Sequence, residues 1–141
     1  MNITIAHTEE ERKDAQHIRM TVFVKEQNVP IEIELDEHDR EAIHFVGYKN
    51  GLPIAASRLR FFNSFGKLER ISVLKSYRGQ SYGKQMIQQM EEVIKKHGYA
   101  QVKLNAQTSA VDFYRNMGYK VTSNEFIDAN IPHVTMEKTL S

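Results

Sequence analysis

The 141-residue sequence contains no cysteine and no tryptophan, and it has only three prolines and seven glycines. The lack of cysteine excludes a disulfide framework, a thiol nucleophile and a thiolate metal site. No apolar run approaches the roughly 18 residues of a membrane span. The N-terminal sequence MNITIAHTEEE also lacks an apolar stretch of signal-peptide length. We therefore expect a cytoplasmic protein without a membrane partner.

A surplus of charge of one sign is also missing, since 19 basic residues stand against 18 acidic ones. An electrostatic nucleic-acid binder would carry a basic face or stripe, so we do not expect nucleic acid as a partner. The hydrophobic fraction of 40% and the charged fraction of 26% are typical of a globular domain. A chain of this length usually forms one domain, which we assign to residues 1–141.

The hydrophobic patterns of the N-terminal half predict a strand, a helix and a three-stranded meander. After a short strand at 2–6, Thr8 and Glu11 form a capping box that opens a helix. The helix should end before Pro30. Residues 25–41 are strongly acidic, and we interpret them as an irregular, charged surface loop. The meander strands are predicted at 42–49, 52–62 and 67–74, with Asn50-Gly51 forming a type I′ turn.

In the C-terminal half, an amphipathic helix should follow residue 81 and end at Gly98. A strand at 101–105 then completes a strand–helix–strand unit, which requires a right-handed parallel crossover. A short helix near 109–116 and strands at 119–124 and 133–140 follow. This order predicts an α/β (α+β) fold with a mixed β-sheet flanked by helices.

Residues 77–84, YRGQSYGK, join a predicted strand to a predicted helix. The first N–H groups of a helix lack internal partners and can bind an anion, and small residues allow close approach of the backbone. The loop combines small and basic side chains, namely Arg78, Gly79, Ser81, Gly83 and Lys84. Its spacing fits neither a Walker A loop nor a dinucleotide fingerprint. The segment could therefore hold a phosphate or be an ordinary tight turn.

The loop pattern Arg-x-x-[small]-x-Gly resembles the pyrophosphate loop of the GCN5-related N-acetyltransferases (GNATs). A second segment, AVDFYRNMGY (110–119), resembles the family's Ala-x-x-Phe-Tyr-x-x-x-Gly-[Phe/Tyr] pattern. A narrower resemblance to the ElaA/YjcF-type branch rests on VFVKEQNVP (22–30), on Asp36 and Asp39, and on IPHVTM (131–136). The sequence departs from the family pattern at Ser81, where Gly is usual, and at Gln107, where Asn is frequent.

The resemblance implies that residues 1–141 form an N-acetyltransferase domain with acetyl-CoA as co-substrate and no metal. It implies direct acetyl transfer to a primary amine in a ternary complex. It also implies that the coenzyme is bound by Ile71, Ser72, Val73, Arg78, Gly79, Gln80, Ser81, Tyr82, Gly83, Lys84, Gln107, Phe113 and Tyr114. The alternatives are a non-catalytic acyl-CoA sensor or interaction module on the same fold and a nucleotide-binding protein.

Acetyl transfer requires a group that protonates the leaving thiolate and a group that deprotonates the amine. By the resemblance Tyr114 faces the sulfur and is the candidate acid, although it could simply pack against the sheet. Glu69 is the candidate base, with Glu26 as a weaker competitor, although either could be an ordinary ion-paired side chain.

The acceptor is a small-molecule or peptide amine that the sequence does not identify. His44 and His133 lie in predicted strands that could line its pocket, although a hydrogen-bonded structural histidine is the favoured interpretation of each. If the acidic residues at 32–41 cap the pocket, they would favour a cationic amine. Asp36-Glu37-His38-Asp39 has no second ligand group at metal-binding spacing. We expect a monomer or a homodimer.

Overall fold

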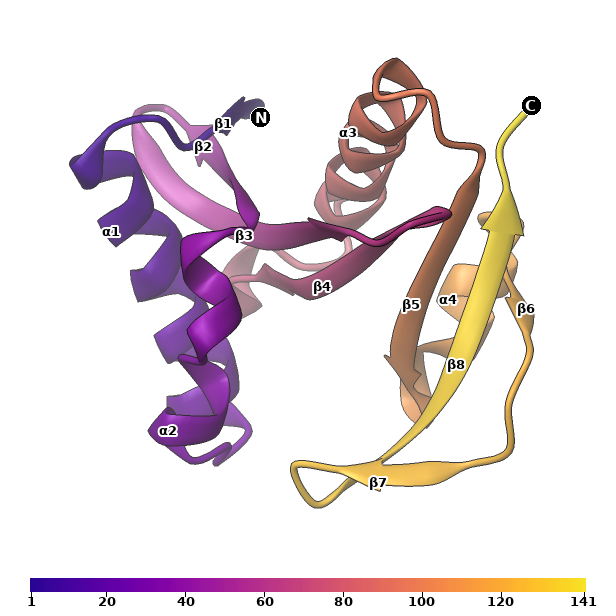
Figure 1. Ribbon diagram of the computed structural model, residues 1–141. Coiled ribbons are helices and arrows are strands. Elements are labelled where there is room, and N and C mark those ends of the chain that lie inside the picture. The colour runs from indigo at the N-terminus through magenta and orange to yellow at the C-terminus, as the bar shows by residue number, and fades with distance from the viewer.

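An eight-stranded sheet organises the chain in the computed structural model, which describes residues 1–141 (Figure 1). The strands are β1 Asn2–Ile5, β2 Ile43–Lys49, β3 Leu52–Phe61, β4 Phe65–Val73, β5 Gln101–Gln107, β6 Lys120–Val121, β7 Phe126–Asp128 and β8 Ile131–Thr139. Their spatial order is β1-β2-β3-β4-β5-β8-β6, with β7 also pairing with β8. Only β4 and β5 are parallel, which confirms the predicted parallel pairing of these two strands.

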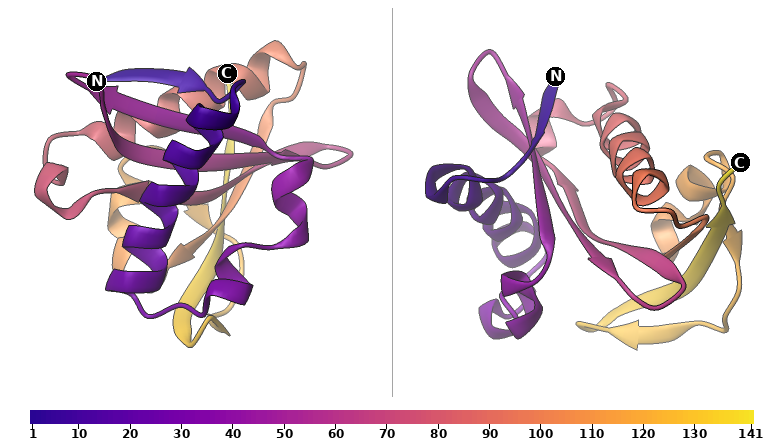
Figure 2. Two further views of the ribbon diagram at one scale, coloured as in Figure 1. Left: turned by 90° about the vertical axis from the view of Figure 1, so that its left-hand side faces the viewer. Right: turned by 45° about the horizontal axis from the view of Figure 1, so that its top comes forward.

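Helices cover both faces of this sheet (Figures 1 and 2). The helical segments are α1 Glu9–Arg19, the π-helix η1 Met20–Glu26, α2 Ile31–Glu34, α3 Tyr82–Lys96 and α4 Val111–Arg115, with short 3-10 turns η2 Glu37–Arg40, η3 Lys75–Tyr77 and η4 Thr108–Ala110. The α1 helix packs on β2 and β3, whereas α3 packs on the other face of β3 and β4. No helix is long and apolar enough to cross a membrane.

The local signals of the sequence account for the main element boundaries. The Thr8 hydroxyl accepts a hydrogen bond from the Glu11 N–H, and the Glu11 carboxylate accepts one from the Thr8 N–H, both at 3.0 Å. This capping box confirms the predicted start of α1. Asn50 and Gly51 both have positive φ, as a type I′ hairpin turn requires. Gly98, at φ 86°, follows the end of α3.

The core lies between the sheet and α3. Met86, Ile87, Met90 and Ile94 point from α3 into a cluster with β3, β4, β5 and β8 side chains. A smaller cluster on the other face joins α1 to β2 and β3. Burying a large apolar side chain contributes roughly 1.5–3 kcal/mol, so α3 is firmly fixed to the sheet. The loop at its N-terminus is therefore held in place relative to β4.

Two sequence predictions are corrected by the structure. The strand expected at 119–124 is only Lys120–Val121, and a separate strand, β7, follows it. The acidic segment 25–41 is not an irregular, solvated loop, because it includes α2 and η2. The Glu34 side chain in that segment is buried rather than exposed.

Candidate active site

A cleft opens where β4 and β5 diverge. The two strands pair from Phe65↔Gln101 to Leu68↔Leu104 and no further. Beyond Leu68, β4 pairs with β3 alone, and beyond Leu104, β5 pairs with β8 alone. The gap forms a cavity of ≈ 250 Å³, lined by Phe23, Gln27, Lys67, Leu68, Glu69, Arg70, Ile71, Leu104, Asn105, Ala106, Gln107, Ala110, Tyr114, Asp128 and His133.

A β-bulge in β4 sharpens this divergence. Ala56 pairs with Ser72 whereas Arg58 pairs with Glu69, so β4 carries one more residue than β3 over this stretch. Arg70 takes up the extra length with a left-handed φ of 56°. After the bulge, residues 71–73 have no strand partner on the β5 side. Their free backbone edge can bind an extended ligand by strand-like hydrogen bonds.

Six consecutive backbone N–H groups, those of residues 79–84, have no acceptor within the chain; the next, of Gln85, donates to the Ser81 carbonyl at 3.0 Å. They surround the N-terminus of the 15-residue helix α3, where the helix dipole also favours an anion. Gly79 has φ 79° and Ser81 has φ 67°. The loop therefore needs left-handed backbone at two positions, and only one of them is glycine.

The basic and aromatic side chains at this loop differ in their exposure, and therefore in whether they can contact a ligand. Lys84 is exposed and forms no ion pair, so it is free to approach a ligand. The Tyr82 ring is buried in the core, which leaves its N–H as the group that faces outward. A side chain at Gly83 would meet the Phe113 ring at 3.6 Å. Gly83 and the exposed Phe113 thus lie together beside the loop.

Arg78 is held by the protein itself. Its two terminal nitrogens donate to the Glu26 carboxylate at 2.6 and 2.8 Å, and its Nε donates to the Val73 carbonyl at 2.9 Å. The Arg78 hydrogen bonds lower the pKa of Glu26. Together these contacts tie the loop to the end of η1 and to the free part of β4. Glu26 is thereby placed beside the loop at residues 77–84 and does not line the cleft.

Tyr114 lines the cleft from α4. Its hydroxyl forms no hydrogen bond with the protein, and its ring makes edge contacts with Phe113 and Tyr119. Burial raises the pKa of Tyr114 to about 12. The phenol therefore stays protonated near neutral pH and is available as a proton donor inside the cleft.

Glu69 also lines the cleft, but three cations hold its carboxylate. Arg58 bonds to it at 2.8 and 2.9 Å, Lys67 approaches to 3.1 Å and Arg60 to 3.4 Å. Burial alone would raise the pKa of Glu69, but Arg58 and Lys67 outweigh that effect and lower it. A carboxylate with a lowered pKa is a weak proton acceptor, so these contacts favour an electrostatic role for Glu69.

Glu69 belongs to a buried ion network that connects the acidic segment to the sheet. Arg58, which is 1% exposed, also binds Asp36 at 2.7 Å and Asp39 at 2.9 Å. Arg19, 2% exposed, binds Glu34 at 2.7 Å and Asp39 at 2.8 Å. The acids of 32–41 that face inward are thus neutralised by arginines. They do not supply a free negative surface to the cleft.

The other predicted residues fall into two groups. His133 lines the cleft, stacks on Phe126, and its Nδ1 lies 2.7 Å from the Ile131 carbonyl. Gln107 lines the cleft as well, where its amide donates to Gln27 at 2.9 Å. His44 does not line the cleft, so that expectation was wrong. It faces a second cavity beside α1, where its Nε2 lies 2.8 Å from the Asp39 carbonyl.

Sequence reasoning missed several residues of the site, among them Gln27, Asp128 and Arg58. Both Gln27 and Asp128 line the cleft, but Gln27 lies in the segment VFVKEQNVP, which indicated only the family branch, and Asp128 lies in a segment with no distinctive pattern. Arg58 does not line the cleft, yet it positions Glu69. A signal for Arg58 was present, because it is a charged residue within the largely apolar strand LPIAASRLRFF. A charge at such a position needs a buried partner.

A family model for the acetyltransferase (GNAT) domain matches residues 5–140. The chain belongs to the GNAT acetyltransferase family. It is 48% identical to the uncharacterized N-acetyltransferase YjcF of Bacillus subtilis over 98% of this chain and 99% of the relative. This GNAT chain also superposes on the crystal structure of Escherichia coli ElaA with a TM-score of 0.88 and 25% identity, covering 98% and 99% of the two chains. These matches confirm the ElaA/YjcF branch.

A more distant structure, an aminoglycoside 6'-N-acetyltransferase complexed with coenzyme A, has a TM-score of 0.77 at 13% identity and covers 99% of this chain and 97% of its own. At that identity the likeness shows the shared fold alone. The family match and the close relatives together make this protein a GNAT N-acetyltransferase, a family that uses acetyl-CoA.

Proposed function

We propose that this GNAT protein transfers the acetyl group of acetyl-CoA directly to a primary amine in a ternary complex, within one catalytic domain spanning residues 1–141. The observation that carries the proposal is the presence of two stretches of free backbone on one side of the sheet, namely the edge of β4 that has no β5 partner and the six N–H groups of residues 79–84. The N–H groups of the loop would bind the pyrophosphate. The backbone of Ile71, Ser72 and Val73 would bind the pantetheine arm.

The side chains of the predicted coenzyme-binding residues would have different roles. The Ser72 hydroxyl already donates to the Ala56 carbonyl at 3.2 Å, so Ser72 contributes backbone groups only. Lys84 would approach a phosphate, and Phe113 would cover the coenzyme beside Gly83. Arg78 and Glu26 would shape the loop from behind, and Gln80 offers its N–H. Gln107, fixed by Gln27, would define the cleft on the β5 side.

In the chemical step, the Val73 N–H would polarise the acetyl carbonyl and stabilise the oxyanion that forms when the amine attacks. The C–S bond then breaks, and Tyr114 would donate its proton to the departing thiolate. The raised pKa keeps Tyr114 protonated before the step, and burial in the same cleft disfavours the free thiolate anion, so its protonation is favoured there. Because the sequence contains no cysteine, no cysteinyl acyl-enzyme can form, which supports direct transfer.

Proton removal from the amine is assigned to His133 rather than to Glu69 alone. The Ile131 carbonyl can only accept, so Nδ1 of His133 carries the proton and a neutral ring has its acceptor lone pair on Nε2. Glu69 would instead hold Arg58 and Lys67 in place and so fix the charge distribution at this wall of the cleft. His133→Gln should then lower kcat much more than Glu69→Gln does.

The acceptor would carry a second positive group. Asp128 lines the cleft and forms no ion pair, unlike Glu69, so it can bind a cationic substituent of the amine. The acidic segment 32–41 gives no such support, because arginines neutralise its inward-facing carboxylates. Asp128→Asn should raise KM for diamines and lysine-like amines, whereas KM for neutral monoamines should stay unchanged.

The proposed reaction is tested by following thiol release from acetyl-CoA with a panel of primary amines. Varying both substrates should give intersecting double-reciprocal lines, as a ternary complex requires. Parallel lines would indicate a covalent acyl-enzyme and would refute direct transfer. Binding of acetyl-CoA without turnover of any amine would favour the non-catalytic module, an alternative that the strained Ser81 keeps open.

A further inference from the structure

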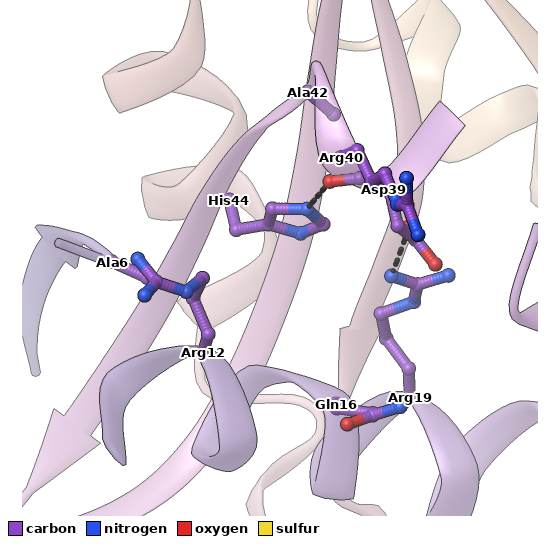
Figure 3. Close-up of a pocket in the computed structure, with 8 residues that line it drawn as sticks. All are labelled: Ala6, Arg12, Gln16, Arg19, Asp39, Arg40, Ala42 and His44. Atoms are coloured by element: carbon purple, nitrogen blue, oxygen red, sulfur yellow. Dashed lines mark hydrogen bonds and ion pairs between the residues drawn. The ribbon is translucent and has the colours of Figure 1, made fainter. Parts of the chain in front are cut away.

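A second cavity lies away from the cleft, between α1, the η2 turn and the start of β2. Its volume is ≈ 460 Å³, which is within the range of small-molecule sites. Figure 3 shows its lining residues, which are Ala6, Arg12, Gln16, Arg19, Asp39, Arg40, Ala42 and His44. None of these residues lines the cleft between β4 and β5. The cavity is therefore separate from the proposed acetyl-transfer site.

The unpaired arginines of the protein converge on this cavity. Of the eight arginines in the sequence, six form ion pairs with carboxylates, and the two that form none are Arg12 and Arg40. Both line the cavity, one from α1 and one from η2. Arg12 donates one hydrogen bond to the His7 carbonyl at 3.1 Å, and Arg40 donates none within the protein. Most of their N–H groups are thus free to bind a ligand.

The carboxylate of the cavity does not cancel this positive charge. Asp39 is the one acidic lining residue, and its Oδ1 accepts hydrogen bonds from Arg19 at 2.8 Å and from Arg58 at 2.9 Å. Figure 3 shows Asp39 turned toward Arg19. Asp39 and Arg19 therefore form a fixed ion pair in the cavity lining, in which their charges neutralise each other. The remaining charge of the lining belongs to Arg12 and Arg40.

Two uncharged groups complete the polar lining. His44 lies between Arg12 and Asp39, and its Nε2–H donates to the Asp39 carbonyl (Figure 3). Its Nδ1 is then an acceptor in the neutral ring, so it suits a ligand hydroxyl. The exposed Gln16 amide has no partner in the protein and can donate as well as accept. Guanidinium groups pair with carboxylate or phosphate in a bidentate manner.

We propose that this cavity binds a small polyanion, a carboxylate or phosphate compound with a hydroxyl group, held by Arg12 and Arg40 from opposite walls. Binding requires no acetyl-CoA, because the two cavities share no residue. It also does not depend on the proposed acetyl transfer, so either proposal can fail alone.

The test is calorimetric titration of the full chain at constant ionic strength, with citrate in one arm and inorganic phosphate in the other. The arms separate a carboxylate site from a phosphate site. Arg40→Gln alone should weaken the better ligand at least about fivefold, and Arg12→Gln/Arg40→Gln by well over tenfold. Arg115→Gln, which removes an exposed arginine of α4, is the matched control and should bind like the unaltered protein.

Saturating coenzyme A should leave the affinity unchanged, and so should Lys84→Gln in the phosphate-binding loop. The Arg40 side chain is exposed and forms no hydrogen bond or ion pair in the protein, so the single variant should keep its melting temperature and remain informative if the double variant unfolds. Equal binding by the Arg12/Arg40 variants and by Arg115→Gln would overturn the proposal. Competition with coenzyme A would also overturn it, because the anion would then occupy the loop.

Discussion

Two tyrosines five residues apart offer a matched test of the chemical step. Tyr114 lines the cleft and its hydroxyl has no partner in the protein, whereas the Tyr119 hydroxyl donates to the buried Glu91 carboxylate at 2.7 Å. The same substitution, Tyr to Phe, removes one oxygen from each. If Tyr114 is the general acid, Tyr114→Phe should lose turnover and keep its stability, whereas Tyr119→Phe should lose stability and keep its turnover.

For Tyr114→Phe, turnover should fall roughly 100- to 10,000-fold, the range that a positioned general acid contributes. Stability should change by less than about 0.5 kcal/mol, because no hydrogen bond within the protein is lost. Since the pKa of Tyr114 is about 12, only about one part in ten thousand of the phenol is ionised at pH 8. The acid form is thus present throughout the working range, and an alkaline loss of activity below pH 10 must come from another group.

For Tyr119→Phe, the loss of a hydrogen bond to a charged, buried acceptor should cost roughly 1.5–3 kcal/mol of stability. Glu91 would keep its contact with Lys138 at 3.1 Å. In a chain of this size each 1 kcal/mol corresponds to about 2–4 °C in melting temperature. Turnover at a temperature where the variant is folded should be nearly unchanged.

The assay is thiol release from acetyl-CoA with the best amine found, combined with thermal melts of both variants. Acetyl-CoA affinity serves as the control and should be retained in Tyr114→Phe. Loss of turnover in Tyr119→Phe equal to that in Tyr114→Phe, or normal turnover in Tyr114→Phe, would refute the assignment of the acid.

Three further predictions concern the loop and the ion network. Ser81→Gly should relieve roughly 1–2 kcal/mol of left-handed strain and lose about half of that gain to chain entropy, which thermal melts would show as a rise of a few degrees. Glu26→Gln should free Arg78 and raise KM for acetyl-CoA up to about fivefold at constant kcat, since an exposed pair contributes at most about 1 kcal/mol; a changed kcat would contradict this role. Burial tends to raise the pKa of Asp39, but Arg19 and Arg58 outweigh this effect and hold it below its usual value. The ionised carboxylate therefore stabilises the fold above about pH 4, and this stabilisation is lost as the pH falls further. Asp39→Asn should be less stable than the unaltered protein at pH 7 and should lose less stability on acidification.

Local signals explain why much of the fold could be predicted from the sequence. The capping box at Thr8, the Asn50-Gly51 turn and the Gly98 stop each act within a few residues, and each lies where the sequence indicated. The loop at residues 77–84 could be proposed as a phosphate site for the same reason, because its small residues, its charge and the helix that follows are contiguous. These features require no knowledge of distant partners.

The errors involve interactions between distant segments. The acidic segment looked solvated because its partners Arg19, Arg58 and Arg70 lie far away along the chain. The three-residue strand β7 is defined only by its pairing with β8. His44 and His133 both lie in strands, and only the sheet order separates them, since β2 and β8 lie on opposite sides of β4.

The base also could not be assigned from the sequence. From the sequence, Glu69 is a carboxylate on a predicted strand, and the adjacent Arg70 is its evident ion-pair partner. In the fold its carboxylate meets Arg58 and Lys67, which changes its acid–base character. Whether a carboxylate accepts protons depends on charges that the topology brings together.

The most direct test of the central claim is the melting temperature of the protein with acetyl-CoA, beside ATP and NAD as controls. Acetyl-CoA at 100 times its dissociation constant adds about 2.7 kcal/mol of stability, which corresponds to a rise of roughly 5–10 °C for a chain of this size. We predict such a rise with acetyl-CoA and little or none with ATP and NAD. No rise at millimolar acetyl-CoA would contradict the account, because the free N–H groups of residues 79–84 would then not bind the coenzyme.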